Sequence, residues 1–185
     1  MGCHGGFALD EGTRRSWYNP ELVLQDLGPG MVFADIGCGD GFFTFLAARK
    51  VGKDGKVYAV DVDAAAIQKI KDRAKTEGLK NIVTRISRAE ETVFCNECAD
   101  FVFYSMVLHD FDDPSKVLKN AKEMLKSNGQ VVDLDWKKIE MPFGPPFQIR
   151  FTEKKASVLM QEAGFTVSNI KEVGAYHYLL IAKST

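Results

Sequence analysis

The chain has 185 residues, of which 45% are hydrophobic and 26% charged, and its formal net charge is −1 at pH 7. This length is enough for one hydrophobic core and too short for two ordinary domains, so a single domain over residues 1–185 is expected. A nearly balanced charge offers no electrostatic footprint for nucleic acid or for an anionic membrane. A small molecule is therefore the expected partner.

The N-terminal residues lack the charged and apolar regions of a signal peptide, and no apolar run approaches the ~20 residues of a membrane-spanning helix. A cytoplasmic protein is expected, with its four cysteines as reduced thiols. Cys95 and Cys98 form one CxxC motif, which only Cys3 and His4 could complete as a metal site, by approaching in space. The preferred interpretation is an ordinary polar loop with no metal.

Turn residues and hydrophobic periodicity predict alternating strands and helices. Residues 1–12 are Gly-rich and weakly patterned, which predicts a flexible segment or a flap that a ligand orders. Asn19 and Pro20 predict the start of a short helix through Leu27. The following strands are predicted at Met31–Ile36, Val57–Val60, Ile82–Ile86, Phe101–Ser105 and Gln130–Trp136, and the helices at Phe42–Val51, after Asp63, from Pro114 to Asn128, and after Thr152.

The C-terminal part differs in pattern from the rest. Residues 137–151 contain three prolines and no clean period, which favours a lid-like functional loop over a simple connection. Segments Phe165–Val173 and Tyr176–Lys183 flank Gly174 and predict a hairpin. The pattern as a whole predicts a doubly wound, mostly parallel α/β sheet with an antiparallel last strand.

The most informative motif follows the first predicted strand. Gly37, Gly39 and Gly41 let the backbone turn tightly and approach a ligand closely. Their spacing is one residue shorter than the dinucleotide motif GxGxxG, and the flanking Asp35 and Asp40 would repel a pyrophosphate. A cationic ligand, with an ammonium or sulfonium group, fits this loop better than NAD.

A second acidic position follows the next strand. Asp61 stands 20 residues after Gly41, where a carboxylate can accept hydrogen bonds from both hydroxyls of a ribose. The alternative is that Asp61 or Asp63 only caps the next helix. Capping is preferred for Asp63, and ribose binding for Asp61.

The ordered set of motifs resembles the class I S-adenosylmethionine-dependent methyltransferases, and within them the small-molecule branch that includes quinone-biosynthesis C-methyltransferases. The resemblance extends from about Trp17 to Ala182 and implies a seven-stranded Rossmann-like sheet. It also implies S-adenosylmethionine as cofactor. The motifs that carry it are residues 34–41, 59–61, 89–90, 100–113 and 125–129.

The resemblance implies roles for individual residues. The glycine loop, with Asp35, Gly37, Cys38, Gly39 and Gly41, would lie beside the methionine moiety. The other expected cofactor residues are Asp61 and Val62 at the ribose, Ala89 and Glu90 at the adenine, and Ser105 near the sulfonium. One departure concerns the adenine: the acid that often precedes the Ala is Arg88 here, so the adenine amine needs Glu90, a backbone group or water as its acceptor.

His109 and Asp110 follow the fourth strand, where they can face the transferred methyl group. A base is needed only if the acceptor carries a proton that it does not lose by itself, and imidazole has a suitable pKa. A His in such a loop also commonly hydrogen-bonds a backbone carbonyl, and this alternative is preferred.

Aromatic and long side chains in the two irregular segments are expected to form the acceptor pocket: Trp17, Tyr18, Tyr104, Met106, Phe111, Met141, Phe143, Phe147 and Arg150. With no inserted substrate domain, the pocket is shallow, closed by the lid, or completed by a second subunit in a homodimer. The functions kept as alternatives are an RNA or protein methyltransferase and a non-catalytic cofactor-binding protein.

Overall fold

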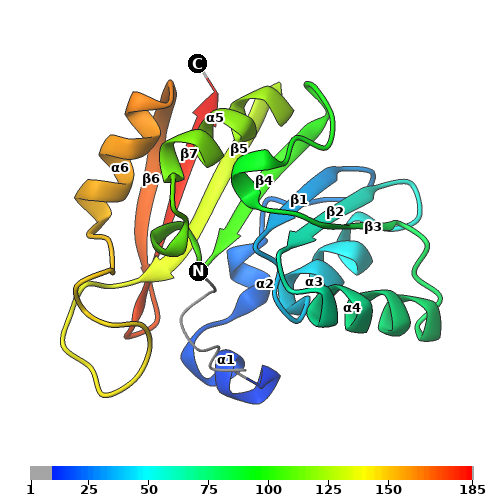
Figure 1. Ribbon diagram of the computed structural model, residues 1–185, viewed down its shortest axis with the longest axis horizontal. Helices are drawn as coiled ribbons and strands as arrows, with labels where there is room; N and C mark the ends of the chain where they lie inside the picture. The colour runs from blue at the N-terminus through cyan, green and yellow to red at the C-terminus, as the bar shows by residue number, and fades with distance from the viewer. Residues whose placement is uncertain (1–9, 185) are drawn as a thin grey trace.

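The computed structural model describes residues 10–184. Its strands and helices alternate along most of the chain (Figure 1). The strands are β1 (Val32–Ile36), β2 (Lys56–Asp61), β3 (Ile82–Ile86), β4 (Ala99–Ser105), β5 (Leu125–Trp136), β6 (Phe165–Val173) and β7 (His177–Ser184). The α-helices are α1 (Glu11–Trp17), α2 (Pro20–Val23), α3 (Phe42–Val51), α4 (Ala64–Thr76), α5 (Pro114–Met124) and α6 (Glu153–Glu162), with short 3-10 helices η1 (Ala89–Glu91) and η2 (Leu108–Asp110).

The seven strands form one sheet in the order β3-β2-β1-β4-β5-β7-β6. The strand pairs from β3 to β5 are parallel, whereas β7 runs antiparallel to both β5 and β6. The chain reverses direction across the sheet between β1 and β4, which is the switch point where α/β proteins bind ligands. The predicted fold, a mostly parallel sheet with an antiparallel last strand, is confirmed.

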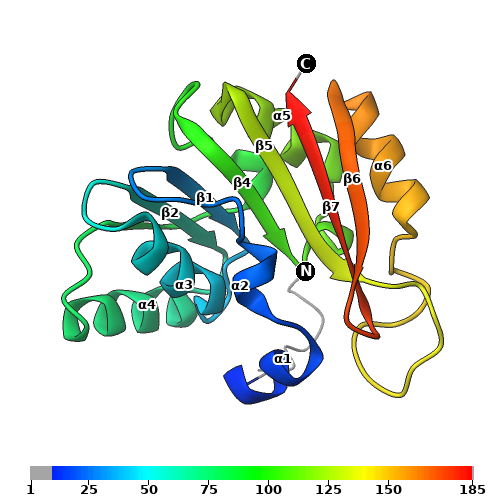
Figure 2. The ribbon, with the colours of Figure 1, turned by 180° about the vertical axis from the view of Figure 1, so that it is seen from behind.

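Helices cover both faces of the sheet. Figure 1 shows α5 and α6 on one face, and Figure 2 shows α2, α3 and α4 on the other. Each face has its own apolar core, because alternate strand residues point to opposite sides. Tyr104 and Leu180 lie in the α5/α6 core, and Phe33 and Phe103 lie in the α2/α3 core.

Four helices begin where the sequence predicts a cap, α2 among them with Asn19 as its cap. The Asp63 carboxylate accepts hydrogen bonds from the Ala65 and Ala66 amides. Asp113 and Thr152 cap α5 and α6 in the same way. These caps satisfy backbone N–H groups that a helix leaves unpaired at its start.

Helix α5 ends earlier than the periodicity predicts. The predicted helix extends to Asn128, but the structure ends it at Met124 and places Leu125 in strand β5, paired with Ala99. The irregular start of the strand requires glycine at position 129, since a Cβ there would come within 2.9 Å of the Ala99 carbonyl oxygen. The pairing with β4 therefore overrides the helical pattern of the sequence.

The N-terminal segment contains a helix that the sequence analysis does not predict. Glu11 and Gly12 begin α1, and the Asp10 side chain caps it by accepting from the Thr13 amide at 2.9 Å. Of the segment expected to be flexible, residues 10–12 form the cap and the first turn of this helix. The rest of that expectation falls on residues 1–9, which lie outside the described part of the chain.

The loop at residues 137–151 has no helix or strand, as predicted, but it is held together by one side chain. The Arg150 guanidinium, which is 3% exposed, donates hydrogen bonds to the carbonyl oxygens of Pro145, Ile139 and Phe143 at 2.8, 2.9 and 2.9 Å. Arg150 therefore braces the loop rather than facing an acceptor as expected.

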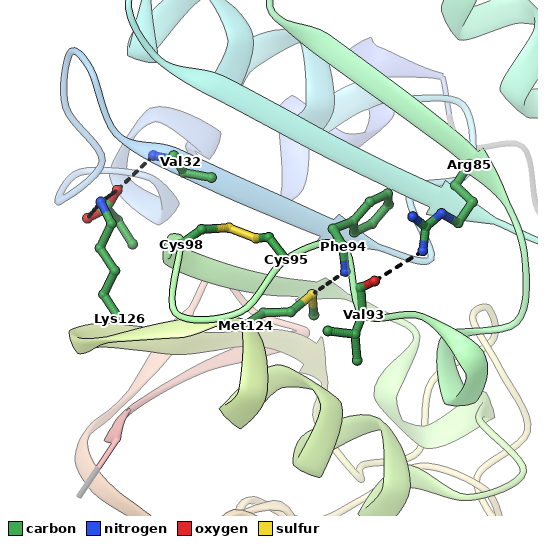
Figure 3. Close-up of a disulfide and its surroundings, with 9 residues drawn as sticks. Val32, Arg85, Val93, Phe94, Cys95, Cys98, Met124 and Lys126 are labelled. Carbon is green, nitrogen blue, oxygen red and sulfur yellow. Dashed lines mark hydrogen bonds and ion pairs between the residues drawn. A yellow bond between two sulfur atoms is a disulfide. The ribbon is translucent and has the colours of Figure 1, made fainter.

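The CxxC motif corrects another expectation. Cys95 and Cys98 are joined in a disulfide at the start of β4, with Cα atoms 6.0 Å apart, instead of remaining reduced thiols (Figure 3). Nearby, Asp100 accepts from the Val32 amide at 2.8 Å and pairs with the Lys126 ammonium at 2.8 Å. Cys3 and His4 lie outside the described residues, and residues 10–184 contain no cluster of His, Cys, Asp or Glu that could hold a metal.

Within residues 10–184, no helix is both long and apolar enough to cross a membrane.

Candidate active site

The carboxyl ends of the parallel strands surround a cavity of about 600 Å³ that is partly open to solvent. Six of the predicted site residues line it, from four different segments: Gly37, Asp61, Val62, Ala89, Glu90 and Asp110. Val60, Ser87, Arg88, Val107, Phe111 and Asp112 complete the lining.

Gly37 shapes the floor of this cavity. Its φ is +75°, in the left-handed region, and its amide donates to the Val60 carbonyl at 2.9 Å. A Cβ at this position would lie 2.7 Å from Cγ2 of Val107. Glycine is thus required both by the backbone conformation and by the close approach of the loop that follows β4.

Asp61 connects the cavity to the glycine loop. One carboxylate oxygen accepts from the Gly39 amide at 2.8 Å, and the other accepts from the Asp63 amide at 2.9 Å. These two bonds fix the plane of a carboxylate that still has free lone pairs facing the cavity. Asp63, not Asp61, caps α4, as the sequence analysis prefers.

Cys38, Gly39 and Gly41 belong to the glycine loop but do not line the cavity, and neither does Asp35 at the end of β1. Asp35 is 1% exposed and accepts a hydrogen bond from the Thr44 hydroxyl of α3 at 2.5 Å. Burial is the main cause that raises the pKa of Asp35 to about 7, and the nearby Asp61 adds to it. Burial likewise raises the pKa of the Cys38 thiol, which therefore stays protonated.

The expected adenine end is formed by η1. Asn120 of α5 donates to the carbonyl oxygens of Ala89 and Glu90 at 3.1 and 2.8 Å and so holds η1 in place. Arg88, which replaces the usual acid, lines the cavity, donates to Asp112 at 2.6 Å and lies 3.6 Å from the Glu90 carboxylate. The position before Ala89 therefore provides no acceptor, and Glu90 remains the carboxylate at this end of the cavity.

The end of β4 combines backbone strain with an unpaired hydroxyl. Met106 has a φ of +57°, which is uncommon for a residue other than glycine. The Ser105 hydroxyl is buried and has no hydrogen-bond partner among the described residues. Both features are common where a protein prepares a site for a ligand.

His109 bonds to a carboxylate and not to a backbone carbonyl, contrary to the preferred alternative. Its Nδ1 lies 2.8 and 2.9 Å from the two oxygens of Asp135, at the end of β5. Both side chains are 1% exposed. Burial lowers the pKa of His109, but the Asp135 carboxylate outweighs this effect and the net pKa is raised above its ordinary value. The sequence analysis missed Asp135; an acid within the apolar run Val131–Trp136 was its only signal.

Aromatic side chains join the N-terminal segment to the loop at residues 137–151. Trp17 stacks on Phe143 with ring centroids 5.3 Å apart and contacts Trp136 and His177. Gly174 of the β6–β7 turn lies directly beside this segment, since a Cβ there would be 1.9 Å from the Trp17 carbonyl oxygen. The two expected pocket segments are therefore in contact.

Two members of the expected acceptor pocket lie elsewhere. Tyr104 is fully buried in the α5/α6 core and donates to the Val117 carbonyl at 3.4 Å. Phe111 lines the cofactor-sized cavity. Strand alternation explains the first difference, because Tyr104 and Ser105 point to opposite faces of the sheet.

The residues fit a cationic nucleoside. Asp61, Glu90, Asp110 and Asp112 line the cavity, and Asp35 lies beneath the loop beside it. This acidic surrounding favours a sulfonium or ammonium group and disfavours a pyrophosphate. The tight backbone at Gly37 provides the close approach that such a ligand needs.

Comparisons with known proteins agree with this geometry. A family model described as "Methyltransferase domain" matches residues 27–174. The crystal structure of a SAM-dependent methyltransferase from Aquifex aeolicus superposes with a TM-score of 0.90 and 31% identity, covering 96% of this chain and 95% of that one.

Curated relatives are longer than this chain. A ubiquinone/menaquinone biosynthesis C-methyltransferase from Hydrogenovibrio crunogenus is 30% identical over 71% of this chain and 52% of its own length. A demethylmenaquinone methyltransferase from Bacillus mycoides is 27% identical over 65% of this chain and 51% of its own. The chain thus spans about half the length of these relatives. The family match over most of the sequence and the close similarity to the Aquifex structure show that this chain belongs to the S-adenosylmethionine-dependent methyltransferases.

Proposed function

We propose that this chain transfers the methyl group of S-adenosylmethionine to a small-molecule acceptor by in-line displacement. The observation that carries the proposal is the cavity at the carboxyl edge, where the Asp61 carboxylate is fixed by the Gly39 amide beside an open volume of about 600 Å³. When bound, S-adenosylmethionine supplies a methyl group that its sulfonium already activates. The protein's task is then to align the acceptor and exclude water.

The roles of the residues follow from their positions. Asp61 and Val62 bind the ribose, and Ala89 and Glu90 bind the adenine. Gly37 and Gly39 form the cradle of the methionine moiety, and Cys38 and Gly41 shape it from behind through their backbone. Asp35 provides negative charge beneath it, Ser105 contacts the cofactor near the sulfonium, and His109 and Asp110 face the acceptor.

The acceptor lies between the end of β4 and the loop at residues 137–151, which acts as its lid. The aromatic contact between Trp17 and Phe143 supports this placement, because it gives the two segments a shared apolar surface next to the site. The curated relatives are named as C-methyltransferases of ubiquinone and menaquinone biosynthesis, so hydroxylated aromatic precursors are the first acceptors to test.

A two-stage assay tests the proposal. Calorimetry should show binding of S-adenosylhomocysteine that NAD does not displace. A screen with a methyl-labelled donor should then transfer label to at least one small aromatic acceptor. Transfer to RNA or to protein instead would favour the alternative substrate classes, and tight binding without any transfer would indicate a non-catalytic cofactor-binding protein.

The remaining proposals concern the whole protein. We propose one domain, a cytoplasmic location, no nucleic-acid partner and a homodimer in which the second subunit closes the acceptor pocket. Light scattering tests the dimer, and a mass equal to one chain at assay concentration would rule it out. A lack of salt-dependent RNA binding would support the absence of a nucleic-acid partner.

A further inference from the structure

His109 and Asp135 form a buried polar pair, and the proposed roles leave its second member, Asp135, unexplained. Asp135 lies at the end of β5, and His109 lies in η2, whose Leu108 is anchored in the apolar core. An imidazole and a carboxylate with only 1% side-chain exposure are costly to bury. Their position beside the expected methyl-transfer site suggests a role beyond packing.

Asp135 determines which nitrogen of His109 carries a proton. A carboxylate can only accept hydrogen bonds, so Nδ1 must be the donor. The Asp135 side chain is itself held in place, because the Trp136 amide donates to its Oδ1 at 2.8 Å. Nε2 is then left with a free lone pair whenever the ring is neutral.

The free nitrogen lies next to the cofactor-sized cavity. Nε2 of His109 is buried and has no hydrogen-bond partner among the described residues. It lies 3.6 Å from the Asp110 carboxylate, too far for a hydrogen bond, and Asp110 lines the cavity. A buried proton acceptor without a hydrogen-bond partner among the described residues thus lies one residue away from the lining of the site where methyl transfer is proposed; His109 itself does not line the cavity.

We infer that Asp135 is a positioning residue, which holds His109 in the Nδ1–H form so that Nε2 can take the proton of an acceptor that does not ionise by itself. This inference rests on the proposed function. As Nε2 takes the proton, the electron pair left on the acceptor forms the bond to the methyl carbon. The pair of the broken carbon–sulfur bond stays on sulfur, and the imidazolium later gives its proton to water.

The charges around His109 give this role a pH signature. Asp135 and Asp110 raise the pKa of His109, whereas burial and Arg150 lower it, and the net pKa is above its ordinary value. Asp133, on the same face of β5, has a pKa raised by burial and by Asp135. Because only neutral His109 accepts a proton, activity should rise with pH through the pKa of His109.

The decisive variant is Asp135→Asn. Its affinity for S-adenosylhomocysteine should stay within about twofold of the wild type, while kcat should fall about 100- to 1,000-fold, in the range of general-base contributions. The acid limb of the pH–rate profile should move to lower pH, because the group that raises the pKa of His109 is lost. His109→Gln should show a similar loss, and the double variant should be no slower than His109→Gln alone.

Asp100→Asn is the matched control, since it also removes a hydrogen-bonded carboxylate from the sheet, here a partly buried one, and lies at the opposite edge. The acid limb of its pH–rate profile should lie at the same pH as in the wild type. If the acid limb of the pH–rate profile is unchanged in Asp135→Asn, the pair only supports the fold. The same conclusion follows if the kcat losses of the two single variants add up in the double variant.

A measurement on the unmodified protein tests the inference without any variant that could fold poorly and without a known acceptor. The chain has three histidines, so nitrogen NMR of labelled histidine can resolve His109 with and without S-adenosylhomocysteine. The neutral ring should carry its proton on Nδ1. A proton on Nε2 would overturn the inference even if methyl transfer is observed, and failure to find any acceptor would count against the proposed function alone.

Discussion

The two edges of the sheet differ in how completely their polar groups are paired. At the amino edge, Asp100 binds both the Val32 amide and the Lys126 ammonium, and the disulfide closes the turn before β4 (Figure 3). At the carboxyl edge, Ser105 and His109 each keep a buried polar atom without a partner among residues 10–184. The amino edge also has one such atom, the Asn81 Oδ1 before β3, so the difference between the edges is one of degree. The two unpaired groups at the carboxyl edge lie where a ligand is expected, as is common at binding sites.

Removing the ribose carboxylate should give the largest effect at the carboxyl edge. Asp61→Ala should weaken binding of S-adenosylhomocysteine about 100-fold, equal to about 2.7 kcal/mol, because hydrogen bonds to a charged group are lost. Calorimetry measures the change, and thermal unfolding without ligand checks that the fold is retained. Equal affinity in wild type and variant would refute the ribose assignment.

The corresponding change at the amino edge should affect stability and not binding. Asp100→Ala should lower the free energy of unfolding by about 2 kcal/mol, because it leaves the Val32 amide unpaired and removes the partner of Lys126. Urea unfolding measures this loss. A marked change in cofactor affinity would contradict the separation of the two edges.

Reduction of the disulfide should have a smaller effect. The Cys95–Cys98 bridge closes a very short loop, so its loss should lower the free energy of unfolding by no more than about 2 kcal/mol. The test compares unfolding with and without reductant, with the double variant Cys95→Ser and Cys98→Ser as control. Reductant should not alter the stability of that variant, and methyl transfer should continue in both.

The smallest expected effect is a pH dependence of cofactor binding. Asp35 has a pKa of about 7, raised mainly by burial, so its carboxyl loses its proton as the pH rises through neutrality. A cationic cofactor favours the ionised form, and its affinity should therefore increase with pH, by about tenfold at most between pH 6 and pH 8. Calorimetry across this range measures the trend, which Asp35→Asn should abolish.

Local signals were sufficient for most of the fold. The predicted limits of α3, β3 and β6 agree with the structure, because their apolar patterns coincide with the ends of the elements, and glycines flank both ends of α3 and β6. The end of α5 was not predictable, since the contact between Leu125 and Ala99 depends on residues distant in the sequence. Helix α1 was missed because a Gly-rich start obscured the Asp10 cap.

The site was predictable where a motif lies directly after a strand. Gly37, Asp61 and Ala89 each follow a strand, and the topology brings them to one cavity. Asp135 was not identified, because its partner His109 lies 26 residues away and no local pattern joins them. The disulfide also could not be inferred, since the composition indicated a reducing environment.

Gly174 allows the contact between the N-terminal segment and the β6–β7 turn to be recognised from sequence alone. Any residue with a Cβ at this position would collide with the Trp17 carbonyl oxygen, and so would displace the helix that leads to the stacked Trp17 and Phe143 rings. Homologous chains can therefore be sorted by one letter: those with glycine in this turn are able to keep the same cover over the acceptor side, and those with a larger residue must build it differently.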